Sequence, residues 1–107
     1  MPKFLFKGSY TAEGAKGLIH DGGTKRRAAV EAMVKKSGGT MESFYYAFGD
    51  ADVYLIVDLP DMTAAVATSL LVNASGAVNL KTIPLFTVEE MDQAAHTQLK
   101  YTAPGSA

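Results

Sequence analysis

The stretch covering residues 43–61, SFYYAFGDADVYLIVDLPD, constrains the fold more than any other part of the chain. Its β-branched and aromatic residues predict two strands, residues 40–48 and 52–59, joined by a Gly-Asp-Ala-Asp turn. A proline then ends the second strand, and Asp61 is placed to cap a helix. We therefore expect a central β-hairpin against which the rest of the core packs.

Before the hairpin, the pattern predicts one strand and two helical segments separated by a glycine pair. Residues 3–10 alternate apolar and polar side chains as a strand does. Thr11 is placed to cap a short helix in which Leu18 and Ile19 are buried, and Thr24 to cap a second helix after the glycines. The apolar positions of the second helix fall on one face at helical spacing; they are Ala29, Val30, Met33 and Val34.

After the hairpin, the sequence predicts a helix, a strand and a last short helix. The alanine-rich helix should end at Gly76, which suits a left-handed C-terminal cap. Residues 77–87 predict a strand at a sheet edge, or one bulged at Pro84, because proline removes a donor from the ladder. Thr87 is placed to cap the last helix. The core side chains expected on the alanine-rich helix are Met62, Ala65, Val66, Leu70 and Leu71.

The element order β-α-β-β-α-β plus a terminal helix is that of the ferredoxin-like α+β fold, with an antiparallel sheet. Right-handed crossovers place both main helices on one face, with strand order 4-1-3-2 and residues 52–59 central. A chain of 107 residues has room for one domain. We assign residues 1–95 to that domain and residues 96–107 to a C-terminal tail.

The hairpin strands are apolar on both faces, although helices can cover only one of them. A half-exposed strand should alternate apolar and polar residues, whereas residues 53–57 read Val-Tyr-Leu-Ile-Val without a break. An uncovered apolar face of this kind is typical of an association surface. We therefore expect a homo-oligomer, a dimer or higher, formed through the open sheet face.

Composition excludes several classes of function. The chain has no cysteine, and its net charge of −1 gives no overall field for nucleic acid. No apolar run is long enough for a membrane span, and the lysine-interrupted N-terminus does not resemble a signal peptide. We therefore expect a cytoplasmic protein with no nucleic-acid partner and no membrane partner.

The segment DGGTKRR, residues 21–27, is the first candidate ligand site. Glycines allow a ligand to approach the backbone, while free amides and cations at a helix start suit a carboxylate or phosphate. The alternative is a solvated turn whose cations pair with Asp21, Glu31 or a neighbouring subunit. The candidate residues are Gly22, Gly23, Lys25, Arg26 and Arg27.

A second candidate site is the space between two stacked sheets, which Tyr46 and Tyr54 could line. The alternative is aromatic packing with hydroxyls at the rim. Which tyrosines share a face stays open, because a one-residue shift in register moves every side chain of a strand to the other face. The other polar candidates on these strands are Lys3, Lys7, Tyr10 and Asp58.

The two histidines give no metal-ligand pattern. His20 and His96 are 76 positions apart, with no carboxylate at ligand spacing beside them. We retain His20 as a candidate ligand-binding residue and predict neither a metal nor a cofactor.

Several stretches resemble the GYD domain family: residues 10–18, 21–34, 44–61, 69–78 and 81–91. The resemblance covers nearly the whole chain in order. It implies a small bacterial protein with the dimeric α+β-barrel version of the ferredoxin-like fold. The family has no agreed activity, so the resemblance implies fold and oligomer but no reaction.

The turn of the hairpin carries part of this resemblance. The family takes its name from a Gly-x-Tyr-Asp-like turn, which Gly49 and Asp52 match while Ala51 stands where the family has tyrosine. No role of that tyrosine is therefore carried over. From the residues alone, Asp50 and Asp52 are expected to bond to the backbone of their own turn.

Three functions remain as hypotheses. The first is a non-enzymatic, self-associating module that binds a small anionic metabolite or a protein partner. The second, by analogy of fold alone, is a cofactor-independent oxygenase or isomerase with a site between sheet and helices. Its base would be His20, Asp58 or a tyrosine. The third is haem binding through His20 or His96. The sequence leaves open whether the protein is an enzyme, and it identifies no catalytic residue.

Overall fold

The computed structural model describes residues 1–106 and contains one four-stranded antiparallel sheet. The strand order is β2-β3-β1-β4, which confirms the predicted order with β3 in the centre. The chain therefore has the ferredoxin-like α+β fold. The strands are β1 (Lys3–Tyr10), β2 (Thr40–Tyr46), β3 (Val53–Asp58) and β4 (Val78–Leu85).

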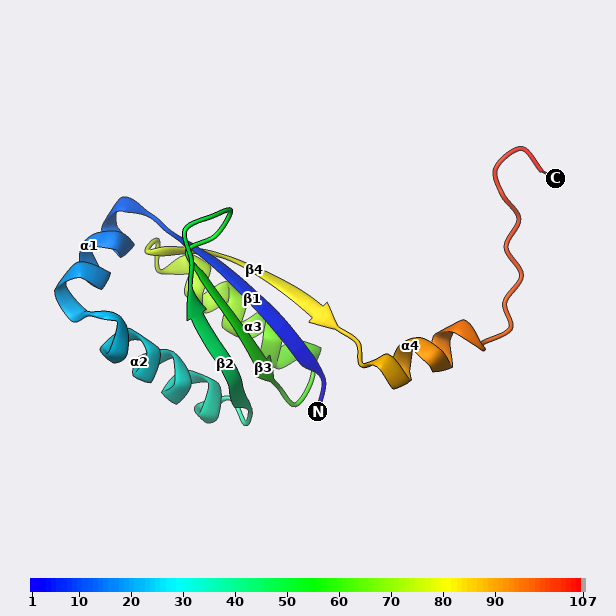
Figure 1. The fold of residues 1–107 in the computed structure, drawn as a ribbon, viewed down its shortest axis with the longest axis horizontal. Helices are drawn as coiled ribbons and strands as arrows, with labels where there is room; N and C mark the ends of the chain where they lie inside the picture. The colour runs from blue at the N-terminus through cyan, green and yellow to red at the C-terminus, as the bar shows by residue number, and fades with distance from the viewer. Residues whose placement is uncertain (107) are drawn as a thin grey trace.

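Two helices cover one face of the sheet and leave the other face open (Figure 1). α2 packs over β2 and α3 packs over β4, while the short α1 lies against α2 and the end of β1. None of the helices in residues 1–106 is both long and apolar enough to cross a membrane. The helices are α1 (Ala12–Asp21), α2 (Gly23–Lys36), α3 (Met62–Ala74) and α4 (Val88–Ala95).

Three of the four predicted helix caps are confirmed, and the fourth is wrong. Thr11, Asp61 and Thr87 each accept a backbone amide of the following turn. Thr24 does not cap α2, which begins at Gly23 with Gly22 as its N-cap, two residues before the predicted cap. Gly22 has φ 83°, so it ends α1 and starts α2 without an intervening loop. Thr24 consequently lies within the first turn of α2.

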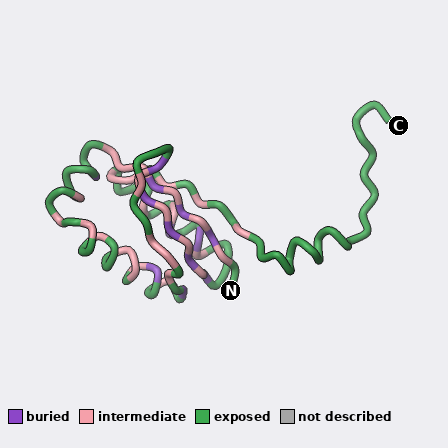
Figure 2. Tube along the Cα trace, in the orientation of Figure 1, coloured by how far each residue is buried: buried purple, intermediate pink, exposed green. Residues whose placement is uncertain are grey.

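The core lies between β1, β3 and the inner sides of α2 and α3. Buried positions concentrate in the strands, whereas α4 and the tail are exposed along their whole length (Figure 2). On α1, Leu18 is half-buried but Ile19 is 84% exposed, so the predicted burial of Ile19 is wrong. The fully packed cluster consists of Phe4, Phe6, Val34, Val53, Leu55, Val57, Leu59 and Ala65.

The inner face of α3 differs from the predicted one. Ala65 and Thr68 are buried against the sheet, and the Thr68 hydroxyl donates to the Ala64 carbonyl at 2.9 Å. Small residues let the helix lie close to the strands, and the larger apolar residues point elsewhere. Four of the predicted core residues, Met62, Val66, Leu70 and Leu71, are therefore exposed.

β4 is an edge strand, as its proline predicted. On its free side, the side chain of Asn73 binds the backbone of Leu80 twice. The Asn73 Oδ1 accepts the Leu80 amide at 2.7 Å, and its Nδ2 donates to the Leu80 carbonyl at 3.2 Å. Pro84 pairs with Phe4 within the sheet, and it has no amide hydrogen to present at the edge.

α4 and the tail, residues 86–106, project from the end of β4 away from the sheet (Figure 1). The radius of gyration is 17.2 Å and the longest dimension is 59 Å. A compact chain of this length has a radius of gyration of about 13 Å. The difference measures how far residues 86–106 extend from the folded body, and we call this segment the C-terminal arm.

Candidate functional site

A groove lies on the helix-covered face of the sheet, between α2 and α3. It encloses a cavity of about 340 Å³, a size at the lower end for small-molecule sites. The walls are mainly apolar, and Arg26 is the one charged residue among the lining side chains of residues 1–106. Lining residues from the sheet and both helices include Phe6, Leu55, Val30, Met33, Leu71 and Leu80.

Arg26 lies in the first turn of α2, and its place depends on how that helix begins. The Tyr46 hydroxyl donates to the Gly23 carbonyl at 2.9 Å. A Cβ on residue 23 would lie 3.1 Å from Cε2 of Tyr46, so glycine allows the ring to pack against the helix start. Arg26 itself is half-buried and forms no ion pair with any other residue of 1–106.

Tyr10 lies beside Arg26 in the groove and is held in place by Asp52. The Asp52 carboxylate accepts the Tyr10 amide at 2.9 Å, and the Asp52 amide donates to the Gly8 carbonyl at 2.8 Å. The expectation that Asp52 would bond to its own turn is therefore wrong. Its carboxylate reaches across to β1 because the turn folds back over the end of that strand.

The phenol of Tyr10 is a hydrogen-bond donor at neutral pH. Burial, and after it the neighbouring Tyr46, raise the pKa of Tyr10 above its usual range, while the Arg26 guanidinium acts in the opposite direction. A side-chain hydrogen bond with Tyr46 raises the same pKa further, so the two hydroxyls lie close to each other. Arg26 and Tyr10 thus present donors, and no carboxylate, to the end of an apolar groove.

A second, wider cavity of about 450 Å³ lies on the other side of Tyr10, towards α1. Tyr46 and Asp52 also line it, together with Leu18 and Phe48. Tyr10 is common to both cavities, so its ring forms part of the wall between them.

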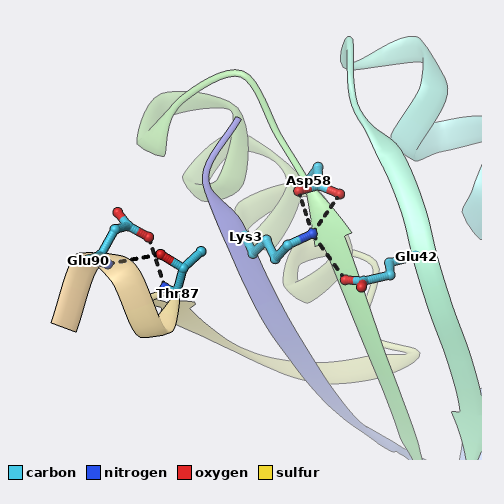
Figure 3. Close-up of polar contacts among 5 residues, drawn as sticks. All are labelled: Lys3, Glu42, Asp58, Thr87 and Glu90. Carbon is cyan, nitrogen blue, oxygen red and sulfur yellow. Dashed lines mark hydrogen bonds and ion pairs between the residues drawn. The ribbon is translucent and has the colours of Figure 1, made fainter. Parts of the chain in front are cut away.

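The open face of the sheet carries a different set of polar residues. Lys3 donates to both carboxylate oxygens of Asp58, at 3.0 and 3.2 Å, and to Glu42 at 3.2 Å (Figure 3). The hydrogen bond that Lys3 donates to Asp58, and then the one that it donates to Glu42, raise the pKa of Lys3. Lys7 lies over the ring of Tyr54, 5.7 Å from its centroid. These residues hold neighbouring strands together and are already paired.

Comparison with known proteins decides the family. A family model described as the GYD domain matches residues 4–95 of this chain. The chain belongs to the GYD domain family. Searches of curated proteins and of solved structures gave no significant match. The matched range includes both walls of the groove and the whole of α4, so the arm's helix is part of the GYD domain.

The candidate residues of the glycine-rich segment lie in three places: on the exposed helix surface, at the groove, and at the break between α1 and α2. Lys25 lies 3.9 Å from Asp21, and Arg27 lies 3.7 Å from Glu31, both on the outside of the helices. Those pairings correspond to the alternative interpretation of a solvated turn. Arg26 alone of the three cations enters the groove, with Gly23 beside it. Gly22 makes the break between the helices.

The predicted tyrosines lie on opposite faces of the sheet. Tyr46 and Tyr10 face the helices, whereas Tyr54 lies on the open face opposite Lys7 and Tyr45. Tyr46 and Tyr54 therefore cannot line one cavity within a single GYD domain. The strand register, which the sequence left open, places the hydroxyls of Tyr46 and Tyr54 on different faces of the sheet.

The histidines of this GYD domain lie outside both cavities. The His20 side chain is 85% exposed and bonds to Asp21 at 3.1 Å, which holds the pKa of that carboxyl below its usual range. His96 caps the end of α4 and its Nδ1 lies 2.7 Å from the Asp92 carbonyl. Residues 1–106 contain no group of three or more side chains able to hold a metal ion.

From the sequence, Tyr10 was a candidate only for the space between stacked sheets, and Asp52 was given no role in the groove. Tyr10 could have been placed there, because it continues the alternation of Phe4, Phe6 and Gly8 along the inner face of β1. The role of Asp52 has no local signal, since its partner amide is 42 residues away.

Proposed function

We propose that this GYD domain is a binding module for a small, mainly apolar molecule that carries one anionic group. The observation that supports this most directly is the unpaired Arg26 at the end of an apolar cavity of about 340 Å³. Burial of apolar surface would supply most of the affinity, at about 25 cal/mol per Å². The guanidinium would set the orientation by pairing with a carboxylate or phosphate.

The polar groups of the groove favour an anion over a cation. The Thr68 and Ser75 hydroxyls donate to carbonyls of their own helix, to Ala64 and Val72. The Arg26 guanidinium is left to meet a ligand, and the Tyr10 hydroxyl, which shares a hydrogen bond with Tyr46, lies beside it. Tyr10 keeps its proton at neutral pH because its pKa is raised. Both groups are donors, and an anionic acceptor matches them.

An acid-base enzyme has less support from the same geometry. The candidate base Asp58 is bonded to Lys3 on the opposite face of the sheet, and His20 is exposed at the surface. Tyr10 is in the groove, but a raised pKa makes a phenol a poor base at neutral pH. The binding module is therefore the function that we propose.

We also propose that the domain self-associates through the open sheet face. Leu5, Ile56 and Ile83 form a row across β3, β1 and β4 on that face, and Ile83 is 38% exposed. Apolar surface of this kind favours contact with another copy. We propose a cytoplasmic location as well, which the lack of cysteines is compatible with.

Decanoate and 1-decanol, which share one alkyl chain, test the binding site. Replacing Arg26 by glutamine should weaken decanoate binding about tenfold or more, because the carboxylate loses its cation. Binding of 1-decanol, which carries no charge, should change by no more than about twofold. Isothermal titration calorimetry on the purified protein measures both affinities.

Arg27→Gln is the matched control, because Arg27 has the same charge one residue away but pairs with Glu31 outside the groove. It should leave decanoate binding within about twofold of the parent chain. Equal losses in the two variants would contradict the proposal, and so would an Arg26→Gln effect of the same size on both ligands. No binding of either ligand to the parent chain would also contradict it.

A further inference from the structure

The C-terminal arm contains a helix that is exposed along its whole length within residues 1–106. α4 has eight residues and none of them is buried. Its apolar side chains Val88 and Met91 are 74% and 55% exposed, and Phe86 just before the helix is 70% exposed. An isolated helix shorter than about 12 residues is marginal in water. The helix therefore needs a surface that this chain does not bring to it.

The start of α4 is nevertheless fully capped. The Thr87 hydroxyl accepts the Glu90 amide at 3.0 Å, and the Glu90 carboxylate accepts the Thr87 amide at 2.9 Å (Figure 3). This reciprocal capping box fixes where the helix begins and which side carries its apolar residues. The sequence thus specifies an amphipathic helix at this position, and a flexible tail would need no such cap.

The open sheet face offers an apolar row and, beside it, a basic row. Leu5 is paired with Ile56 on one side and Ile83 on the other. In the next row, Lys7 lies directly opposite Lys81. Neither lysine forms an ion pair within residues 1–106, although Lys7 also lies over the Tyr54 ring. Like charges directly opposite each other destabilise a sheet, so an anionic group beside the two lysines would be favourable.

α4 has the complementary pattern. Val88 and Met91 are three residues apart, so they lie on one side of the helix. Glu89 and Asp92 follow each of them by one residue and form an adjacent acidic side. Neither carboxylate forms an ion pair in the described part of the chain. An apolar side next to an acidic side matches the two rows of the sheet.

The dimensions also agree. An eight-residue helix is about 12 Å long. The row from β3 through β1 to β4 spans about 10 Å, two strand spacings. The helix can therefore cross all three strands at once.

We infer that α4 of each chain lies across the open sheet face of a second copy, in a reciprocal exchange of C-terminal arms. The occupant is a second copy because the arm leaves β4 in the strand direction, away from its own sheet (Figure 1). Only Phe86 and Thr87 connect the strand to the helix. A two-fold exchange uses both arms and both faces, so the assembly closes at a dimer. This inference rests on the self-association proposed above and names the surfaces that carry it.

Directed disulfide cross-linking tests the exchange, because the natural chain has no cysteine. Met91→Cys and Ile83→Cys chains, one of them carrying a mass tag, are mixed and oxidised. The expected main product is the mixed disulfide between the two. Met62→Cys is the matched control, since Met62 is also an exposed helical methionine, at 52% against 55% for Met91. Its mixture with Met91→Cys should give no more than background cross-linking.

Ile56→Cys repeats the test on the central strand, so the result does not depend on the folding of one variant. Light scattering could show a dimer while Met91→Cys forms no disulfide with Ile83→Cys or with Ile56→Cys. That result would overturn the exchange of arms and leave the proposed self-association intact. Ile83→Cys chains linked only to each other would indicate sheet-on-sheet stacking and overturn it equally. A chain that carries both Met91→Cys and Ile83→Cys could form a disulfide within itself. That result would show that α4 covers the sheet of its own chain and would overturn the exchange with a second copy. A stable monomer at micromolar concentration overturns both proposals.

Discussion

The backbone and carboxylate of Asp52 together connect three parts of the chain. Its carboxylate accepts the Tyr10 amide, its amide donates to Gly8, and its carbonyl accepts the Ala47 amide at 2.8 Å. One residue therefore joins the end of β1 to both ends of the turn between β2 and β3. The wall between the two cavities is fixed by this connection, because Tyr10 forms that wall.

Replacing Asp52 by alanine should lower the free energy of unfolding by about 1–3 kcal/mol, because the part-buried Tyr10 amide loses its acceptor. Urea denaturation measures the change, and an unaltered m-value would show that the unfolded state is the same. Asp50→Ala is the control. Asp50 is exposed and its side chain forms no hydrogen bond within residues 1–106, so the change should stay within about 0.5 kcal/mol. Equal losses would contradict this role.

Gly14 and Gly17, both in α1, should respond in opposite directions to the same substitution. A Cβ on Gly14 would collide with the Ala77 carbonyl, whereas nothing lies within 4 Å of a Cβ on Gly17. Gly14→Ala should therefore destabilise the fold by about 1–3 kcal/mol. Gly17→Ala should stabilise it by about 0.4–1 kcal/mol, because alanine has the higher helix propensity. Thermal unfolding of the two variants checks the sign of each effect, and a stabilising Gly14→Ala would contradict the packing of α1 on this loop.

At the scale of elements, the sequence predicted every strand and helix but assigned some helix faces wrongly. In α3, Met62, Val66 and Leu70 recur every four residues, which is as good a core pattern as the real one of Ala65 and Thr68. A helix that is apolar on several sides has no unique period, so periodicity cannot choose between them. In the structure, α3 packs against the sheet through its side with small residues.

The stability of α4 should depend on pH, because the carboxylate of Glu90 takes part in its capping box. The Thr87 backbone amide, followed by the Thr87 hydroxyl, lowers the pKa of Glu90 below its usual value of 4.5. A lowered pKa means that the capping interaction is complete above about pH 4.5 and is lost as the pH falls through the folded-state pKa. Amide and Cα chemical shifts of residues 88–95, followed from pH 7 downwards, should show α4 losing helicity before the sheet changes.

Glu90→Gln separates this effect from general acid unfolding. Glutamine keeps an acceptor for the Thr87 amide but does not titrate, and it occurs naturally in capping boxes. The variant should retain α4 at neutral pH and lose the acid transition. An identical transition in the parent chain and in Glu90→Gln would show that another group controls the helix.

For the whole molecule, the limit of prediction was the sheet register. β2 shifts its pairing between Met41 and Ser43, so one residue is added to that strand and not to β3. The shift turns Phe44 and Tyr46 towards the helices and leaves Tyr45 on the open face. No local pattern predicts such an insertion, and it decides which tyrosine of β2 faces the helices. The segment that supplies Arg26 was predicted, but which of its three cations enters the groove depended on the tertiary fold.

The two edge strands of this sheet, β4 and β2, hinder one way in which copies of the chain could associate, which is pairing strand to strand. A strand that approaches β4 finds the amide and carbonyl of Leu80 already bonded to Asn73, and no donor at Pro84. At the opposite edge, the irregular pairing of β2 interrupts the flat ladder that a new strand would need. Continuous growth by strand addition, the route to amyloid fibrils, is therefore hindered at both ends of the sheet. Concentrated protein should remain as discrete particles, whatever contacts its two faces make.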